Sequence, residues 1–94
     1  MTISQKSQAH LKKIIKQIAG NIKSGHELYP EVVIAGDGYI SCYSPLDRFF
    51  VKVRRGLAAY VVEEDVTEEK TLIYTIGGNL VEIETRELIE IGFD

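Results

Sequence analysis

The hydrophobic pattern of this 94-residue chain changes its period once, and that change limits the folds open to it. Residues 3–24 repeat apolar side chains at helical spacing, whereas the chain from about residue 31 onward alternates apolar and polar positions with a period of two. A helical pattern followed by a run of strand patterns is typical of an α+β protein with an antiparallel sheet. The length predicts a single domain, 1–94.

The segment 3–24 is predicted to be an amphipathic helix. At about 100° per residue, its apolar residues fall within an arc of roughly 100°. This stripe consists of Leu11, Ile14, Ile15, Ile18 and Ile22. The opposite side carries Lys6, Lys12, Lys13, Lys16 and Lys23. Ser24 and Gly25 supply a helix stop, and Pro30 indicates that the helix does not resume.

Glycine-containing turns divide the remaining chain into three predicted hairpins. The paired segments are 31–35 with 39–43, 47–54 with 57–63, and 71–76 with 79–84. Together they predict an antiparallel meander of about five or six strands, with the helix packed on one face. For the last ten residues the sequence leaves three possibilities open, namely a strand, a short helix that ends at Gly92, or a tail.

Placing each hairpin in register with its turn sorts the strand residues into two faces. One face is almost wholly apolar and is expected to receive the helix: Val32, Ile34, Ile40, Cys42, Phe49, Val51, Val53, Ala58, Tyr60, Val62, Leu72, Tyr74, Ile76, Val81 and Ile83. The other face mixes aromatic, aliphatic and charged side chains, which is the usual make-up of a contact surface. Its predicted partner-binding residues are Tyr39, Tyr43, Phe50, Lys52, Arg54, Leu57, Glu82 and Glu84.

No combination of residues typical of an active site or a metal centre is found in the sequence. Cys42 falls on the apolar face, where a thiol behaves as a small hydrophobe. His10 lies on the helix flank, and His26 follows the helix stop. The acidic run 63–69 lacks the oxygen spacing and the glycine of a calcium loop. We therefore expect a non-enzymatic protein with no metal and no cofactor.

Charge is divided unevenly along the chain. Nine of the 11 Lys and Arg residues precede Gly56, against four acidic residues, whereas ten of the 14 acidic residues follow it. The first part is therefore near +5 and the second near −8. The single cysteine, the lack of a signal-type N-terminus and the lack of a membrane-length apolar run predict a cytoplasmic protein.

These features favour a small protein-binding module or inhibitor. In a narrower version, the acidic half occupies the basic groove of a nucleic-acid-handling protein, as phage-encoded decoy inhibitors do. A homodimer formed through the mixed face is one alternative. Nucleic-acid binding is another, through Lys12, Lys13, Lys16, Lys23 and Arg55, although a pI near 5.4 is far from the basic balance typical of that class.

Overall fold

The computed structural model describes residues 8–23 and 30–91, and within those ranges the chain forms one α-helix and seven strands. The elements are α1 (Gln8–Lys23), β1 (Val32–Ile34), β2 (Tyr39–Ser44), β3 (Phe49–Arg54), β4 (Ala58–Asp65), β5 (Lys70–Thr75), β6 (Leu80–Glu84), the 3₁₀ turn η2 (Thr85–Glu87) and β7 (Leu88–Glu90). All strand pairs are antiparallel. The predicted α+β class, with a helix ahead of an antiparallel sheet, is confirmed.

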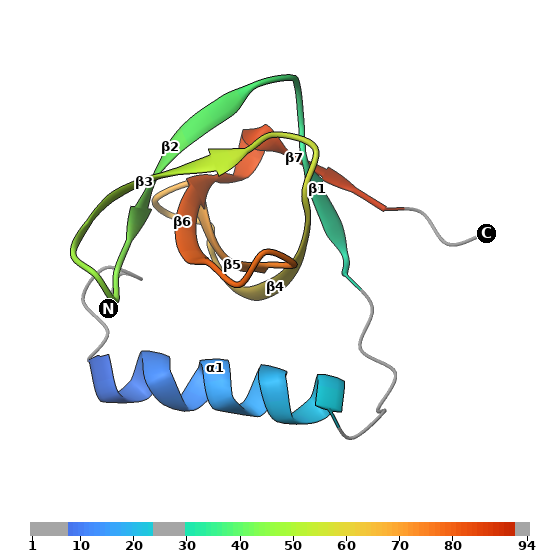
Figure 1. Cartoon of the computed structure of the whole chain (residues 1–94). Helices are drawn as coiled ribbons and strands as arrows, with labels where there is room; N and C mark the ends of the chain where they lie inside the picture. The colour runs from blue at the N-terminus through green and yellow to red at the C-terminus, as the bar shows by residue number, and fades with distance from the viewer. Residues whose placement is uncertain (1–7, 24–29, 92–94) are drawn as a thin grey trace.

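The seven strands form one sheet in the order β3-β2-β6-β5-β4-β1-β7. A single buried core nevertheless contains Ile34 of β1 together with Cys42 of β2 and Val53 of β3. Because three other strands separate β1 from β2 in the order, these residues can meet only if the sheet curls round on itself. Figure 1 shows this curl, with the strands wrapped around a common centre as in a partly closed barrel.

The helix α1 lies against the outside of the curled sheet (Figure 1). Leu11 is completely buried and packs with Leu72 of β5 and Leu80 of β6. Gln8 Nε2 donates a hydrogen bond of 2.7 Å to the carbonyl oxygen of Leu46, which fixes the start of the helix on the loop after β2. The helix therefore covers a second, smaller core that is separate from the one inside the sheet.

Two of the three predicted hairpins do not form. The segment 31–35 does not pair with 39–43, because β1 pairs with β4 and β7 instead. The segment 47–54 does not pair with 57–63, because β3 pairs with β2 around the loop 45–48. Gly36 and Gly38 after β1, and Gly56 after β3, do have positive φ. The chain changes direction at these glycines, but the strands on either side of each corner pair with other strands and not with each other.

The third predicted hairpin forms as β5–β6, but its loop is one residue longer than expected. Thr75 N donates to Asn79 O at 2.9 Å, and Tyr74 lies opposite Leu80. The loop is therefore 76–78 rather than Gly77-Gly78 alone, and Gly78 takes the left-handed position with a φ of 91°. A shift of one residue exchanges the two faces of one strand relative to the other.

This shift changes which residues form the core. Ile73 lies opposite Val81 and points inward, where both are completely buried in the core of the curled sheet. Leu72 and Tyr74, which were expected on that face, lie on the outside and pack in the smaller core with α1. On β4, Ala58 and Tyr60 were expected in the core of the curled sheet, but Ala59 is the β4 residue buried there.

The end of the described chain is strand rather than helix, so the alternative of a short C-terminal helix is wrong. After the 3₁₀ turn η2, β7 pairs with β1, with Leu88 opposite Ile34 and Ile89 opposite Val33. Leu88 packs against the core of the curled sheet, and this hydrophobic contact stabilises the pairing of β7 with β1. β7 adds to the six predicted strand segments, so the sheet of the described residues has seven strands instead of five or six. Gly92 lies outside the described residues.

We predict that Leu11→Ala destabilises the fold by about 2–5 kcal/mol, since it removes a completely buried side chain between the helix and the sheet. Urea denaturation measures the change. The neighbouring Lys12→Ala is the matched control, because Lys12 is exposed and its loss should change the free energy of unfolding by less than about 0.5 kcal/mol. Equal stability of the two variants would contradict the packing described for α1.

Candidate functional site

The outer side of the β2–β3 hairpin carries aromatic and basic side chains in adjacent positions. The register places Tyr39 opposite Arg54, and Tyr43 opposite Phe50. Lys52 lies between these pairs, opposite Ser41. Since directly opposite residues point to the same side of a sheet, all of them share one face. We name Tyr39, Tyr43, Phe50, Lys52 and Arg54 the aromatic–basic surface.

Two of the aromatic rings on this surface are largely exposed. Tyr39 is 68% exposed and Phe50 is 67% exposed. Tyr43 is half-buried, and its ring meets that of Phe50 edge to face, with centroids 5.5 Å apart and an interplanar angle of 69°. This edge-to-face arrangement is favourable for aromatic pairs and holds Phe50 in place on its neighbour. The surface thus contains one packed aromatic pair, Tyr43 and Phe50, beside the exposed ring of Tyr39.

The inner side of the same hairpin is anchored in the core. Cys42 and Val53 are almost completely buried there, and Ile40 packs against them. The alternation along β2 and β3 therefore gives the hairpin one buried side and one exposed side. A surface attached to such a base keeps its geometry when a ligand approaches.

The strand β3 is also an edge of the sheet, since the described residues place only β2 beside it. Its outward backbone groups are available to another strand, as at any open edge. Phe49, at the start of β3, is 57% exposed although its position in the alternation predicted a core residue. Phe49 lies opposite Ser44, so the edge strand exposes one large apolar side chain on each of its two faces.

Three predicted partner-binding residues have other environments. Leu57 follows the corner after β3 and packs half-buried against the inner core, so it does not join the surface. Glu82 lies opposite Tyr43 on β6 and shares its face, but only 7% of its side chain is exposed. Glu84 is exposed and pairs with Arg86 at 2.7 Å. The two glutamates thus border the aromatic–basic surface.

An open pocket of about 450 Å³ lies at this border, and we name it the β2–β6 pocket. Strands β2 and β6 are paired at one position among the described residues, Tyr43 opposite Glu82. The pocket lies beside this position and is lined by residues of both strands. Its polar and aromatic lining comes from Ser41, Tyr43, Phe50, Lys70, Glu82, Glu84 and Glu87. The pocket therefore joins the aromatic rings to a set of carboxylates.

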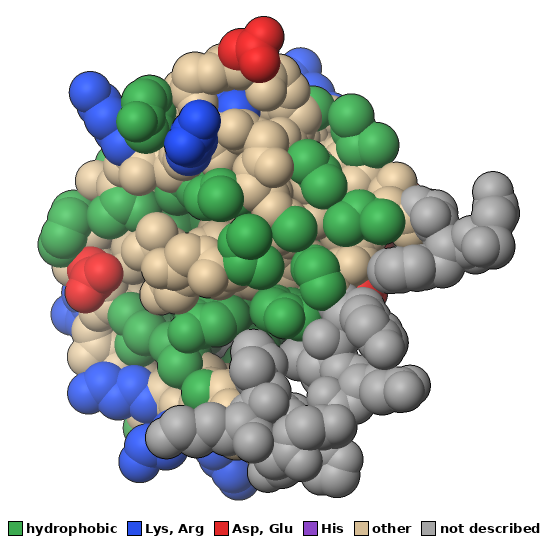
Figure 2. All heavy atoms as spheres, turned by 45° about the vertical axis from the view of Figure 1, so that its right-hand side comes forward, with side chains coloured by type: hydrophobic (Ala, Val, Ile, Leu, Met, Phe, Trp, Pro, Cys, Tyr) green, Lys and Arg blue, Asp and Glu red, His purple; other side chains and the backbone are tan. Residues whose placement is uncertain are grey.

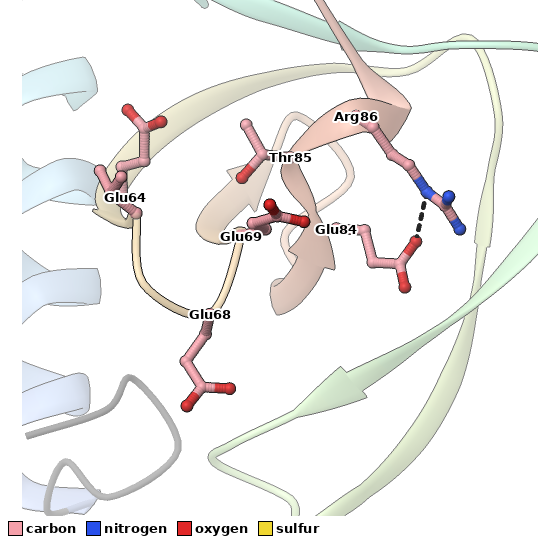
Figure 3. Close-up of a pocket in the computed structure, with 7 residues that line it drawn as sticks. Glu64, Glu68, Glu69, Glu84, Thr85 and Arg86 are labelled. Atoms are coloured by element: carbon pink, nitrogen blue, oxygen red, sulfur yellow. Dashed lines mark hydrogen bonds and ion pairs between the residues drawn. The ribbon is translucent and has the colours of Figure 1, made fainter.

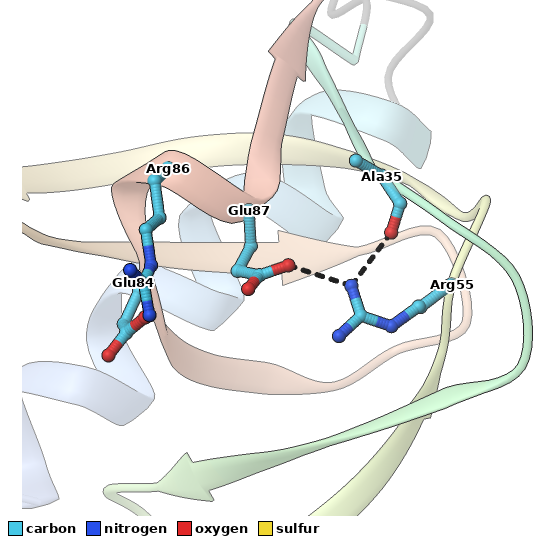
Figure 4. Close-up of polar contacts among 5 residues, drawn as sticks. All are labelled: Ala35, Arg55, Glu84, Arg86 and Glu87. Carbon is cyan, nitrogen blue, oxygen red and sulfur yellow. Dashed lines mark hydrogen bonds and ion pairs between the residues drawn. The ribbon is translucent and has the colours of Figure 1, made fainter.

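Arg55, a candidate for nucleic-acid binding, forms hydrogen bonds within the protein. Its Nη1 donates to the carbonyl oxygen of Ala35 at 2.8 Å and to Glu87 Oε2 at 2.7 Å (Figure 4). The hydrogen bond and charge of the guanidinium lower the pKa of Glu87 below the ordinary glutamate value. With its charge matched in this way, Arg55 is a poor phosphate ligand.

The lysines predicted for nucleic-acid binding lie on a different side of the molecule. Lys12, Lys13 and Lys16 are exposed on α1. Figure 1 shows α1 across the curled sheet from the corner between β3 and β4, where Arg55 lies. The side chain of Lys23, at the end of the helix, is outside the described part. The structure therefore does not bring this candidate set together.

The acidic residues around the β4–β5 turn line a second open pocket, of about 530 Å³. Its carboxylates are spread around the rim in Figure 3, and that of Glu84 is paired with Arg86. Among the described residues, no group of three or more His, Cys, Asp and Glu side chains is placed to hold a metal ion. The lining consists of Glu64, Val66, Glu68, Glu69, Glu84, Thr85 and Arg86.

A second apolar surface, which the sequence did not predict, lies on the outside of β7, β1 and β4. Ile89 lies opposite Val33, Val33 lies opposite Ala58, and the amide of Ile76 bonds to the carbonyl of Ala58. Ile76 and Ile89 are 58% and 59% exposed. Figure 2, with the β1 and β7 side turned forward, shows hydrophobic side chains gathered across this face. No local pattern could predict it, because it depends on the long-range pairing of β1 with β7.

The side chains considered for catalysis are in ordinary environments. Cys42 is only 2% exposed, as expected for a core residue, and burial raises the pKa of its thiol to about 11. His10 is exposed on α1, and His26 lies outside the described residues.

Comparison with known proteins gives no identity for this chain. No protein-family model, no curated protein and no solved structure matches it. Among the described residues, no helix is long and apolar enough to cross a membrane.

We predict that the Cys42 thiol of the folded protein reacts with a disulfide reagent at about pH 8 at least about 100-fold more slowly than in the urea-unfolded protein. The raised pKa keeps the thiol protonated, and only the thiolate is the nucleophile. The release of the coloured thiol product measures both rates. Similar rates in the two states would show that Cys42 is accessible.

The Arg55–Glu87 pair predicts a pH-dependent stability. Because the pKa of Glu87 is lower in the folded state, its charged form stabilises the fold above the ordinary glutamate pKa of about 4.3, and this is lost as the pH falls through the lower folded-state value. Wild type should therefore be more stable than Glu87→Gln near neutral pH, and the difference should shrink in acid. Urea denaturation across pH measures it, with Glu90→Gln as the exposed control. A difference independent of pH would contradict the pairing.

Proposed function

We propose that this chain is a small non-enzymatic protein-binding module, active in the cytoplasm, whose main contact is the aromatic–basic surface. The observation that carries the proposal is the placement of exposed Tyr39 and Phe50 beside Lys52 and Arg54 on one side of an anchored hairpin. Aromatic residues and arginine are enriched in contact surfaces, and they contribute most of the binding free energy there.

The open edge of β3 supports the same proposal. A partner segment in the extended conformation can add to an edge strand through backbone hydrogen bonds, while its side chains contact the adjacent face. Phe49 and Phe50 lie at the start of β3 and are both more than half exposed. A partner that pairs with the edge of β3 could therefore also bury these two aromatic rings.

The acidic residues favour a partner with a basic region. The end of β4, the turn after it and the end of β6 place Glu64, Glu68 and Glu84 around one open pocket. In the narrower form of the proposal, the partner is a nucleic-acid-handling protein and this acidic side occupies its basic groove, as a decoy inhibitor would. A second copy of the chain, joined edge to edge through β3, is the competing occupant.

Nucleic-acid binding is the second candidate, and one observation favours it. Lys52 and Arg54 share a face with Tyr39 and Phe50, so bases could stack where phosphates are neutralised. Against it, the helix lysines are on another side and Arg55 is already paired with Glu87. Among the described residues, Lys52 and Arg54 are the basic residues that share the face of the rings, and two charges neutralise few phosphates.

The proposal predicts that Phe50→Glu weakens partner binding by at least about 2 kcal/mol, or about 30-fold, because it removes a central aromatic contact. A partner captured by the immobilised wild-type protein is purified, and its affinity is measured by calorimetry. Ile89→Glu is the matched control, since Ile89 is 59% exposed on β7, at the other end of the strand order from β3. Circular dichroism checks that both variants fold.

Three results would overturn the proposal. Equal affinities of wild type and Phe50→Glu would remove the aromatic–basic surface as the contact. A dimer mass in light scattering that Phe50→Glu converts to a monomer, with no other partner captured, would assign the surface to a second copy. Binding of labelled single-stranded nucleic acid that weakens steeply with salt, and is lost in Lys52→Glu, would favour the second candidate.

A further inference from the structure

The carboxylate of Glu82 is buried with one of its oxygens unpaired. Only 7% of the side chain is exposed. Its Oε1 lies 3.4 Å from the Nζ of Lys70, whereas its Oε2 is fully enclosed and has no hydrogen-bond partner among the described residues. Buried polar atoms are nearly always hydrogen-bonded, because leaving one unpaired costs free energy. The Glu82 carboxylate is therefore incompletely paired within the described residues.

Lys70 pairs with this carboxylate only at long range. Its side chain is 44% exposed, and the 3.4 Å between its ammonium group and Oε1 exceeds the about 2.7–2.9 Å of a charge-assisted hydrogen bond. The other charged groups of the pocket are matched elsewhere, since Glu84 pairs with Arg86 and Glu87 pairs with Arg55. Glu82 is thus the carboxylate of this pocket that still lacks a full set of partners.

Glu82 lies beside the aromatic–basic surface. Glu82 is opposite Tyr43, and Tyr43 is opposite Phe50, so the three side chains form a row on the outer side of β6, β2 and β3. All three line the β2–β6 pocket. A carboxylate next to two aromatic rings provides both a hydrogen-bond acceptor and a flat apolar wall.

We propose that the β2–β6 pocket binds the guanidinium group of an arginine from the protein partner. A planar guanidinium donates to a carboxylate through several N–H groups and stacks on aromatic rings, so it matches both parts of the pocket. It can bond Oε1 of Glu82 in place of the partly exposed ammonium group of Lys70. An ammonium group is a point charge and does not use the flat wall in the same way. The inference rests on the proposed function, because the arginine belongs to that partner.

The test uses N-acetyl-arginine methylamide as the probe and the ¹⁵N-labelled full chain. In NMR titrations we expect saturable shifts at the amides of Ser41–Tyr43 and Glu82–Glu84. The citrulline analogue, which has the same shape but no charge, should bind at least about tenfold more weakly. Equal shifts with both probes, or shifts that do not saturate, would overturn the inference.

Variants connect the probe to Glu82. Glu82→Gln should weaken binding of the arginine probe at least about tenfold, and Glu90→Gln, an exposed change on β7, should leave it unchanged. Lys70→Met gives an independent test that leaves Glu82 in place. It removes the competing cation, so the probe should bind several-fold more tightly. Unchanged binding in Glu82→Gln, or weaker binding in Lys70→Met, contradicts the assignment.

Failure of this inference can be told from failure of the proposed function. If the probe does not bind but Phe50→Glu still loses the partner, the arginine pocket is wrong and the contact surface stands. If the probe binds but Phe50→Glu keeps the partner, the pocket is a cation site unrelated to the aromatic–basic surface, which overturns the inference as well because it assigns the arginine to that partner.

Discussion

Arg55 connects segments that are far apart in the sequence, and the curled shape of the sheet depends on this connection. Its guanidinium bonds Ala35 after β1 and Glu87 in η2, while its backbone amide donates to the carbonyl of Gly38 before β2. A Cβ on Gly36 would lie 3.1 Å from Arg55 Cδ, and Gly36 also has a φ of 92°. Only glycine therefore fits this corner without strain, and the close approach of the chain there lets both ends of the sheet share one core.

Local patterns predicted the elements of this fold better than their pairing. The helix could be predicted because Leu11 and Ile15 repeat at helical spacing, which is a property of neighbouring residues. The pairing of β1 with β7 could not, because Val33 and Ile89 are distant in the sequence and no turn joins them. Hairpins are the simplest way to pair consecutive strands, so a sequence argument favours them wherever a glycine turn occurs.

The aromatic–basic surface was largely predictable although the hairpin around it was assigned wrongly. Tyr39 and Tyr43 alternate along one strand, as Phe50 and Lys52 do along the next, and alternation fixes which residues share a face whatever the strand pairs with. Leu57 was assigned wrongly for the opposite reason. It follows the corner at Gly56, where the chain changes direction, so the alternation of β3 does not extend to it.

The burial of Glu82 could not be read from the sequence, because it depends on both neighbours in the sheet. On one side lies Tyr43, which continues to exposed Phe50, and on the other lies Leu72, which α1 covers. The outer row of side chains thus runs from exposed Phe50 through Tyr43 and Glu82 to buried Leu72. The carboxylate of Glu82 lies between the exposed and the buried part of this row. Since the Coulomb interactions of a buried charge are screened less than those of an exposed one, the helix that covers Leu72 also sets the electrostatic environment of the Glu82 carboxylate.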